Sequence, residues 1–282
     1  ILTCVCGCTK CVTAQKDTST KGQQSMNKLL LLLSLIISTA SADNLISIDQ
    51  VTSGNSNSIT VTVDGSDNEI DYSFGGASNT VAIDQKGDDA YVGYTATWGS
   101  GAGWGGDLDG DSNDMDIKQL CNQLACEGDR FEFHVAGNNN SIKIGQGYHV
   151  QADGTFQSPD SVEYGGHNIR LDVHGSNNSF IGSQRAGGDN HSNITNIYGS
   201  YNDVYARQEY NFDKSIDLTI SNSNNDVDII QGGSASHSAT ISLSGTYGTD
   251  LDLTQYSSTA QTYSLTQSCA TVGGCSVSVT QE

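Results

Sequence analysis

The chain has 282 residues, a formal net charge of −20 and 35% hydrophobic residues. So acidic a chain repels polyanions, which excludes nucleic acid and anionic lipid as expected partners. Low hydrophobicity with high charge is also typical of disorder, but the single proline and the regular strand periodicity described below argue for a folded chain.

The first 42 residues are predicted to be absent from the mature protein. We interpret residues 1–25 as an upstream translated segment rather than a zinc site, because their four close cysteines lack the usual paired spacing. Residues 26–42 contain Lys28, then an apolar run, and then small residues that end at Ala42. This order is typical of a secretory signal peptide. That run is too short to span a membrane permanently, and its removal leaves 8 basic and 31 acidic residues, a net charge of −23.

From residue 43 to 282, apolar and polar residues alternate over segments of about six, the period of a half-buried strand. In one kind of half-repeat, Asn is followed six residues later by Gln, as in Asn225 and Gln231. The other ends in an aliphatic residue, as in residues 59–63 and 169–173. One of each gives a repeat of roughly 23 residues, with Gly, Asn and Ser at the turns. We therefore predict an all-β fold, a β-solenoid of about eight two-strand rungs.

Amide side chains at equivalent places in successive rungs are predicted to form hydrogen-bonded ladders. In-register stacking repeats each residue about every 4.8 Å, so each amide can donate to one neighbour and accept from the other. An unpaired amide in a dry interior would cost about 1 to 3 kcal/mol. In the alternative interpretation, the glutamines only end solvent-exposed strands and form no ladder. The expected ladder residues are Asn44, Gln50, Asn79, Gln85, Asn140, Gln146, Asn178, Gln184, Asn202, Gln208, Asn225, Gln231, Gln255, Gln267 and Gln281.

Two segments break the pattern, residues 97–129 and 149–164, and we interpret them as loop insertions. Repeat proteins carry insertions in the loops between strands because the stacked strands themselves leave no room for them. The first offers oxygen ligands at alternate positions, as calcium sites do. No cofactor is required, but calcium is a candidate ligand of this segment, with a solvated acidic loop as the alternative. The candidate calcium ligands are Asp107, Asp109, Asp111, Asn113 and Asp116.

A second acidic feature arises from the stacking. Asp226 and Asp228 should align with Asp250 and Asp252 on the next rung. Like charges about 5 Å apart repel, so a cation or outward solvation must relieve them.

Four cysteines lie in the region expected to fold, and a secreted setting favours disulfides. The candidates are Cys269 with Cys275 and Cys121 with Cys126, and cross-pairing between the two sites stays open. The alternative for Cys121 is a reduced cysteine on a short helix over residues 116–126.

No group of residues forms a recognised nucleophile setting, so no enzymatic activity is expected. His134 and His174 fall on the outer face or in the turn of their half-repeats, and Arg170 lies near Asp172. Aromatic residues around the first insertion are candidates for a sugar-stacking platform or a cover for the solenoid. They are Tyr91, Tyr94, Trp98 and Trp104.

The Asn-x5-Gln spacing, the repeat near 23 residues, the Gly and Asn turns and the secretory leader resemble curlin, the subunit of bacterial curli amyloid fibres. The matching positions of the family's second half-repeat are Asn140 and Gln146, Asn178 and Gln184, Asn202 and Gln208, and Asn225 and Gln231. The first half-repeat departs from the family, which has Gln where this chain has Val63, Val135, Val173, Tyr198, Ile220 and Leu243.

The resemblance implies a secreted subunit of extracellular fibres, or fimbriae, at the cell surface, serving adhesion and biofilm matrix. It also implies that copies of the chain are each other's partners through end-to-end rung stacking, and that an outer-membrane secretion pore and a nucleator take part. The residues agree, because neither end of the solenoid carries a proline, a helix or a charged plug. The alternatives are a non-polymerising, tail-fibre-like β-solenoid adhesin that binds glycans, and a β-helix carbohydrate-active enzyme.

Overall fold

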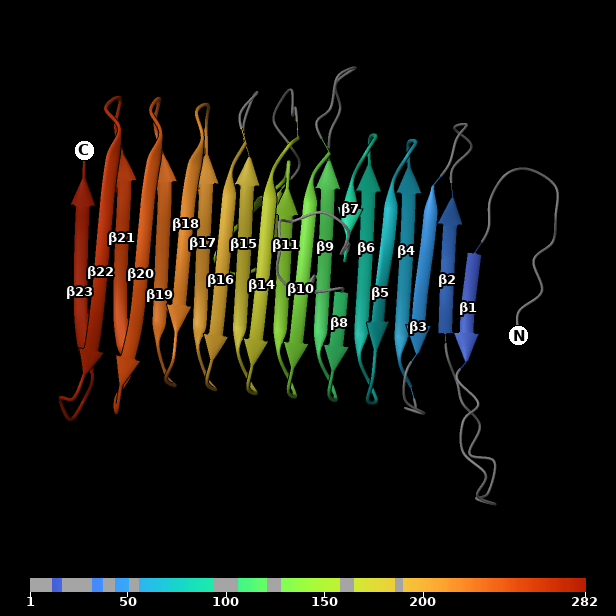
Figure 1. Ribbon diagram of the computed structural model, residues 1–282, viewed down its shortest axis with the longest axis horizontal. Coiled ribbons are helices and arrows are strands. Elements are labelled where there is room, and N and C mark those ends of the chain that lie inside the picture. The colour runs from blue at the N-terminus through green and yellow to red at the C-terminus, as the bar shows by residue number, and fades with distance from the viewer. Residues whose placement is uncertain are drawn as a thin grey trace, which may run out of the picture.

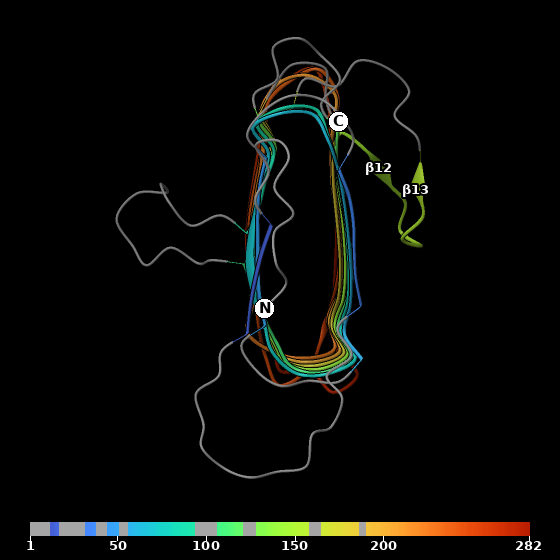
Figure 2. The same cartoon turned by 90° about the vertical axis from the view of Figure 1, so that its right-hand side faces the viewer.

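A computed structural model of the protein describes residues 12–16, 32–37, 44–50, 56–93, 106–120, 128–157, 165–185 and 190–282. The described residues form the expected all-β fold, a parallel β-solenoid of about eight turns. In Figure 1 the strands lie side by side in chain order from the N-terminus to the C-terminus. Seen along the stack in Figure 2, two sheets form the long sides of a flattened cross-section, and turns join them at both ends.

Each turn of the chain adds one strand to each sheet, except that one turn adds two short strands, Tyr91–Val92 and Gly106–Asp109, to sheet A. Sheet A contains β1 (Val12–Lys16), β3 (Leu45–Gln50), β5 (Glu69–Phe74), β7 (Tyr91–Val92), β8 (Gly106–Asp109), β10 (Arg130–Ala136), β14 (Asn168–His174), β16 (Ser192–Tyr198), β18 (Lys214–Ile220), β20 (His237–Gly245) and β22 (Gln261–Cys269). Sheet B contains β2 (Leu32–Ile37), β4 (Ser58–Asp64), β6 (Thr80–Lys86), β9 (Asp114–Leu120), β11 (Ser141–Gln146), β15 (Ser179–Arg185), β17 (Asp203–Glu209), β19 (Asp226–Gly232), β21 (Thr249–Tyr256) and β23 (Cys275–Gln281).

The alternation in the sequence decides which side chains face the core. In β18, Ile216, Leu218 and Ile220 are buried, while Asp217 between them is exposed on the outer face. The same alternation in the other strands makes one continuous apolar core between the two sheets. Since a single rung buries too few side chains to fold alone, the stability comes from its neighbours.

Glycines allow the turns to stack at one corner of the solenoid. Gly137 and Gly175 have φ values of +142° and +145°, in the region that favours glycine. A Cβ atom on Gly175 would lie 1.8 Å from the carbonyl oxygen of Gly199 in the next turn. The backbones at this corner are therefore too close for any side chain.

The prediction that residues 97–129 form a loop insertion is wrong for the residues of β8 and β9. These strands complete a rung of the stack, with Met115 and Ile117 buried in the core. The outward positions carry so many carboxylates that they hide the alternation of the strand. β9 also rules out the alternative helix over residues 116–120.

The second predicted insertion is confirmed for residues 149–157. β12 (His149–Val150) and β13 (Phe156–Gln157) form a two-stranded antiparallel ribbon on the outside of the solenoid (Figure 2). Val150 and Phe156 pack against Ile181 and Tyr205 on the outer face of sheet B.

The assignment of the first half-repeats to the two sheets is also corrected. The Asn44 to Gln50 segment lies in sheet A beside strands that end in aliphatic residues, whereas residues 58–64 lie in sheet B with the Gln-ended strands. Apart from β7 and β8, which both join sheet A, the strands of the solenoid alternate between the two sheets along the chain. The place of a strand in this order decides its sheet, and the six-residue spacing alone does not.

Candidate functional site: amide ladders and the terminal rung

A glutamine ladder runs through sheet B. In each step the Nε2 atom of one glutamine donates to the Oε1 atom of the next, at 2.8 to 3.2 Å. Several also donate to the backbone of sheet A, as Gln208 does to the Ser192 carbonyl oxygen at 3.0 Å. The ladder therefore ties neighbouring turns and both sheets together. Its members are Gln85, Gln119, Gln146, Gln184, Gln208, Gln231, Gln255 and Gln281.

An asparagine ladder runs along one corner of the stack. The Oδ1 atom of each residue accepts from the backbone N–H of the next, as in the 3.0 Å bond from Asn178 to Asn140. The Nδ2 atom of Asn178 donates a hydrogen bond to the Gly199 carbonyl oxygen at 2.9 Å, and this bond stabilises the tight glycine turn. The ladder ends at the backbone N–H of Thr249, and its members are Asn57, Asn79, Asn113, Asn140, Asn178, Asn202 and Asn225.

These ladders confirm most of the predicted positions and add three that sequence reasoning missed. Asn57 and the pair Asn113 and Gln119 belong to the ladders. The pair has the six-residue spacing of the other repeats, so the signal was present in the sequence. The carboxylates around Asn113 also fit a calcium-ligand pattern, which conceals the repeat.

Three predicted positions lie elsewhere. The register aligns Gln50 with Phe74 and Gln267 with Leu243, so both fall in an apolar column of sheet A and outside the glutamine ladder. Asn44 makes a short ladder at the opposite corner, where its Oδ1 atom accepts from the N–H of Asn68 at 3.0 Å.

Beyond Asn68, this second corner continues with buried titratable side chains. Oδ1 of Asp129 accepts from the backbone N–H of His167 at 3.0 Å, and the rings of His167 and His191 stack with centroids 5.0 Å apart. Burial raises the pKa of Asp129 to about 7 and lowers the pKa of His167 to about 4. At this corner both the protonated carboxyl group and the neutral imidazole are therefore favoured.

The structure does not bring the five candidate calcium ligands together. Asp107 accepts a hydrogen bond from Ser73 on sheet A, whereas Asp116 makes a 2.7 Å ion pair with Lys143 on sheet B. Asp111 accepts from a backbone N–H in the turn, and Asn113 is buried in the asparagine ladder. Because β8 lies in sheet A and β9 in sheet B, with a turn between them, these side chains lie on different faces of the solenoid and cannot share one ion.

The predicted acidic columns are present. Asp226 aligns with Asp250, and Asp228 with Asp252, on the outer face of sheet B. Burial and then neighbouring carboxylates raise the pKa of both Asp226 and Asp228.

The last rung of the described chain consists of β22 and β23. Its loop is closed by a disulfide between Cys269 and Cys275, as predicted, with their Cα atoms 5.7 Å apart. The other candidate pair, Cys121 and Cys126, lies outside the described residues.

This terminal rung leaves one end of the solenoid open. β22 and β23 each pair with one strand only, so the outer edge of each is unpaired among the described residues. Residues 257–281 contain no charged residue and no proline. Four inward side chains pack on the core but stay partly exposed, namely Tyr263, Leu265, Val277 and Val279.

No protein-family model, curated protein or solved structure matches the chain. Within the part of the chain that the structure describes, no helix has the length and apolar character needed to cross a membrane.

Proposed function

We propose that the chain is the self-assembling subunit of a secreted, curli-like extracellular fibre, in which copies stack head to tail. The open terminal rung carries this proposal. Sheet proteins that stay monomeric protect their edges with charges, prolines, bulges or covering segments. β22 and β23 have neither charges nor prolines, and the half-exposed side chains between them would be buried by another rung.

The strands that would add to this end are β3 and β4 of the next copy. In the described chain β1 and β2 pair with them in register, so loss of the predicted leader would uncover both edges. Continuing the register of the stack sets Leu265 beside Ile48, and Val279 beside Val61, in the neighbouring copy. Both contacts extend the apolar core without a gap.

The two glutamines outside the ladder fit the same junction. Gln50 and Gln267 occupy the two ends of one column of sheet A, from the leader-free start to the terminal rung. The positions between them are apolar, namely Phe74, Leu108, Val135, Val173, Ile197, Ile220 and Leu243. Head-to-tail stacking would make them neighbours and form an amide pair across the junction.

In this proposal the fibre acts at the cell surface in adhesion and as biofilm matrix, as in the family that the repeats resemble. A secretion pore and a nucleator would then be its partners. A glycan-binding monomer is the competing outcome of the test below.

Electron microscopy and fibre diffraction on the full chain, and on the chain from Asp43 to Glu282, test the proposal. Filaments with a meridional spacing of about 4.8 Å are expected, forming faster without the leader. Leu265→Lys is expected to block elongation because it puts a charge into the junction, whereas Thr240→Lys, on the exposed face of β20, leaves it unchanged. Stable monomers that bind glycans on an array, or equal filament growth in both variants, would reject the proposal.

A further inference from the structure

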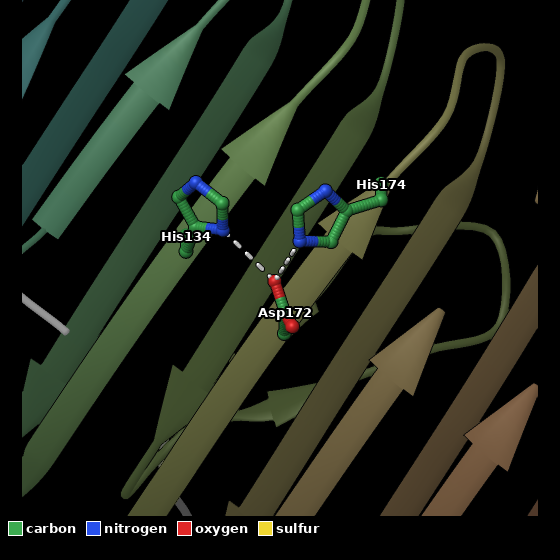
Figure 3. A group of neighbouring side chains, drawn as sticks. All are labelled: His134, Asp172 and His174. Atoms are coloured by element: carbon green, nitrogen blue, oxygen red, sulfur yellow. Dashed lines mark hydrogen bonds and ion pairs between the residues drawn. The ribbon is translucent and has the colours of Figure 1, made fainter. Parts of the chain in front are cut away.

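Two histidines converge on one carboxylate oxygen on the outer face of sheet A. The register places His134 of β10 directly beside Asp172 of β14, and His174 follows on the same face because side chains alternate along a strand. Figure 3 shows both imidazoles directed at the same oxygen atom. Nδ1 of His134 lies 2.9 Å from Oδ1 of Asp172, and Nε2 of His174 lies 3.1 Å from it.

The carboxylate between them is held in place from behind. Asp172 is only 2% exposed, and the hydroxyl group of Tyr198 donates to its second oxygen, Oδ2, at 2.8 Å. The ring of Tyr198 also stacks on His174, with centroids 5.3 Å apart. The hydrogen bond from Tyr198 thus fixes Oδ2 of Asp172, while Oδ1 points at the two imidazoles.

We propose that His134, Asp172 and His174 form a binding site for a divalent transition-metal ion, with Zn²⁺ as the fitting ion. Two imidazole nitrogens and one carboxylate oxygen are a usual ligand set for zinc and related metals, but not for calcium. The three ligand atoms lie within 4.8 Å of one another. In the tetrahedral geometry of zinc, two ligands about 2.1 Å from one ion are about 3.4 Å apart, so each nitrogen–oxygen separation would lengthen by about 0.3 to 0.5 Å when the ion binds.

The surroundings allow an ion to enter and to complete its coordination. The side chains of His134 and His174 are 28% and 45% exposed, so water can supply further ligands. Asp107 of β8 aligns with His134 on its other side and adds negative charge, whereas Arg170 of β14 adds positive charge near Tyr198. Tyr198 would orient the carboxylate through its hydrogen bond, as outer partners of metal ligands do.

A simpler arrangement is that the histidines only donate hydrogen bonds to a buried carboxylate. Both interpretations predict that Asp172→Asn destabilises the fold, so stability cannot separate them. Metal affinity can, because a site made only of hydrogen bonds gives no saturable binding.

The test is a titration of the chelator-treated full chain with Zn²⁺ by calorimetry, and with Co²⁺ by visible absorption. One ion per chain is expected, with Co²⁺ bands typical of nitrogen and oxygen ligands. His134→Ala and His174→Ala should each weaken binding at least about tenfold, and Tyr198→Phe about tenfold. His149→Ala, a histidine of the outer ribbon, is the matched control and should bind as the unaltered chain does.

Circular dichroism of each variant is the check that the fold is kept. His174 is the more informative position, because its exposed ring contributes little to the core. Absence of saturable binding in the unaltered chain, or equal affinity in the His134, His174 and His149 variants, would overturn the proposal.

Discussion

Replacing Gln208 by leucine tests whether the glutamine ladder stabilises the solenoid. The buried Gln208 amide accepts from Gln184 at 2.8 Å and donates to Gln231 at 3.0 Å. It donates a further bond to the Ser192 carbonyl oxygen at 3.0 Å. Leucine fills a similar volume but has no polar atom, so all three neighbours lose a hydrogen-bonding partner.

The Nε2 atom of Gln184 keeps its bond to the Asn168 carbonyl oxygen at 3.0 Å, so the expected cost comes from the other two groups. Each buried group left unpaired costs about 1 to 3 kcal/mol, which gives about 2 to 6 kcal/mol in total. Burial of the leucine side chain returns about 1.5 to 3 kcal/mol. The free energy of unfolding should therefore fall by about 2 kcal/mol, a substantial part of the stability of an ordinary domain.

Gln281→Leu is the matched control within the same ladder. Gln281 accepts one hydrogen bond, from Gln255 at 2.8 Å, and lies half-buried at the open end. Its replacement should cost less than about 1 kcal/mol. The double variant Gln208→Leu/Gln231→Leu should cost less than the sum of the single variants, because the second change removes an oxygen that the first left unpaired.

Urea unfolding followed by circular dichroism, on dispersed chains below the concentration at which they assemble, measures these differences. Amide hydrogen exchange locates them, since a stack loses stability mainly around the altered rung. Equal costs at Gln208 and Gln281, or strict additivity of the double variant, would refute the view that ladder continuity stabilises the fold.

Three further predictions concern the corners and the terminal rung. Asp129→Asn should stabilise the fold by up to about 4 kcal/mol at pH 8 and hardly at all at pH 3.5. The reason is that the pKa of Asp129 is raised from 3.8 to about 7, so the folded state binds the extra proton and its stability falls as pH rises through that window. Urea unfolding at both pH values measures this, and the exposed Asp217→Asn should give no comparable gain. Gly175→Ala should lower the free energy of unfolding by more than about 3 kcal/mol, because its Cβ atom would meet the Gly199 carbonyl oxygen at 1.8 Å. Gly273→Ala, with no atom within 4 Å, should cost about 1 kcal/mol in the same urea unfolding experiments, and similar losses at the two glycines would contradict the steric argument. Reduction of the Cys269–Cys275 disulfide, which closes a short loop, should cost about 2 kcal/mol. Reduction should speed amide exchange in β22 and β23 while β14 and β15 stay protected. Uniform acceleration of exchange along the stack would contradict the view that the disulfide stabilises only the terminal rung.

The solenoid itself could be predicted because its signals are local. Alternation along each strand decides which side chains enter the core. The six-residue spacing from Asn140 to Gln146, repeated along the chain, marks a corner and the far end of the same strand. Both features depend only on strand geometry, so they are readable without knowing how many turns precede them. Asn113 and Gln119 carry the same signal, and only the surrounding carboxylates concealed it.

The tertiary structure decided everything that depends on register between turns. Gln50 and Gln267 show the sequence signal of ladder residues but fall in an apolar column of sheet A. The order of the strands along the chain decides which sheet each strand joins, and the six-residue spacing does not reveal that order. Asp172 meets His134 from 38 residues away, a separation set by the ribbon inserted between their strands. Loop lengths between turns vary without disturbing the stack. Spacing therefore predicts outward neighbours between uninterrupted repeats, as for Asp226 and Asp250, but not across an insertion.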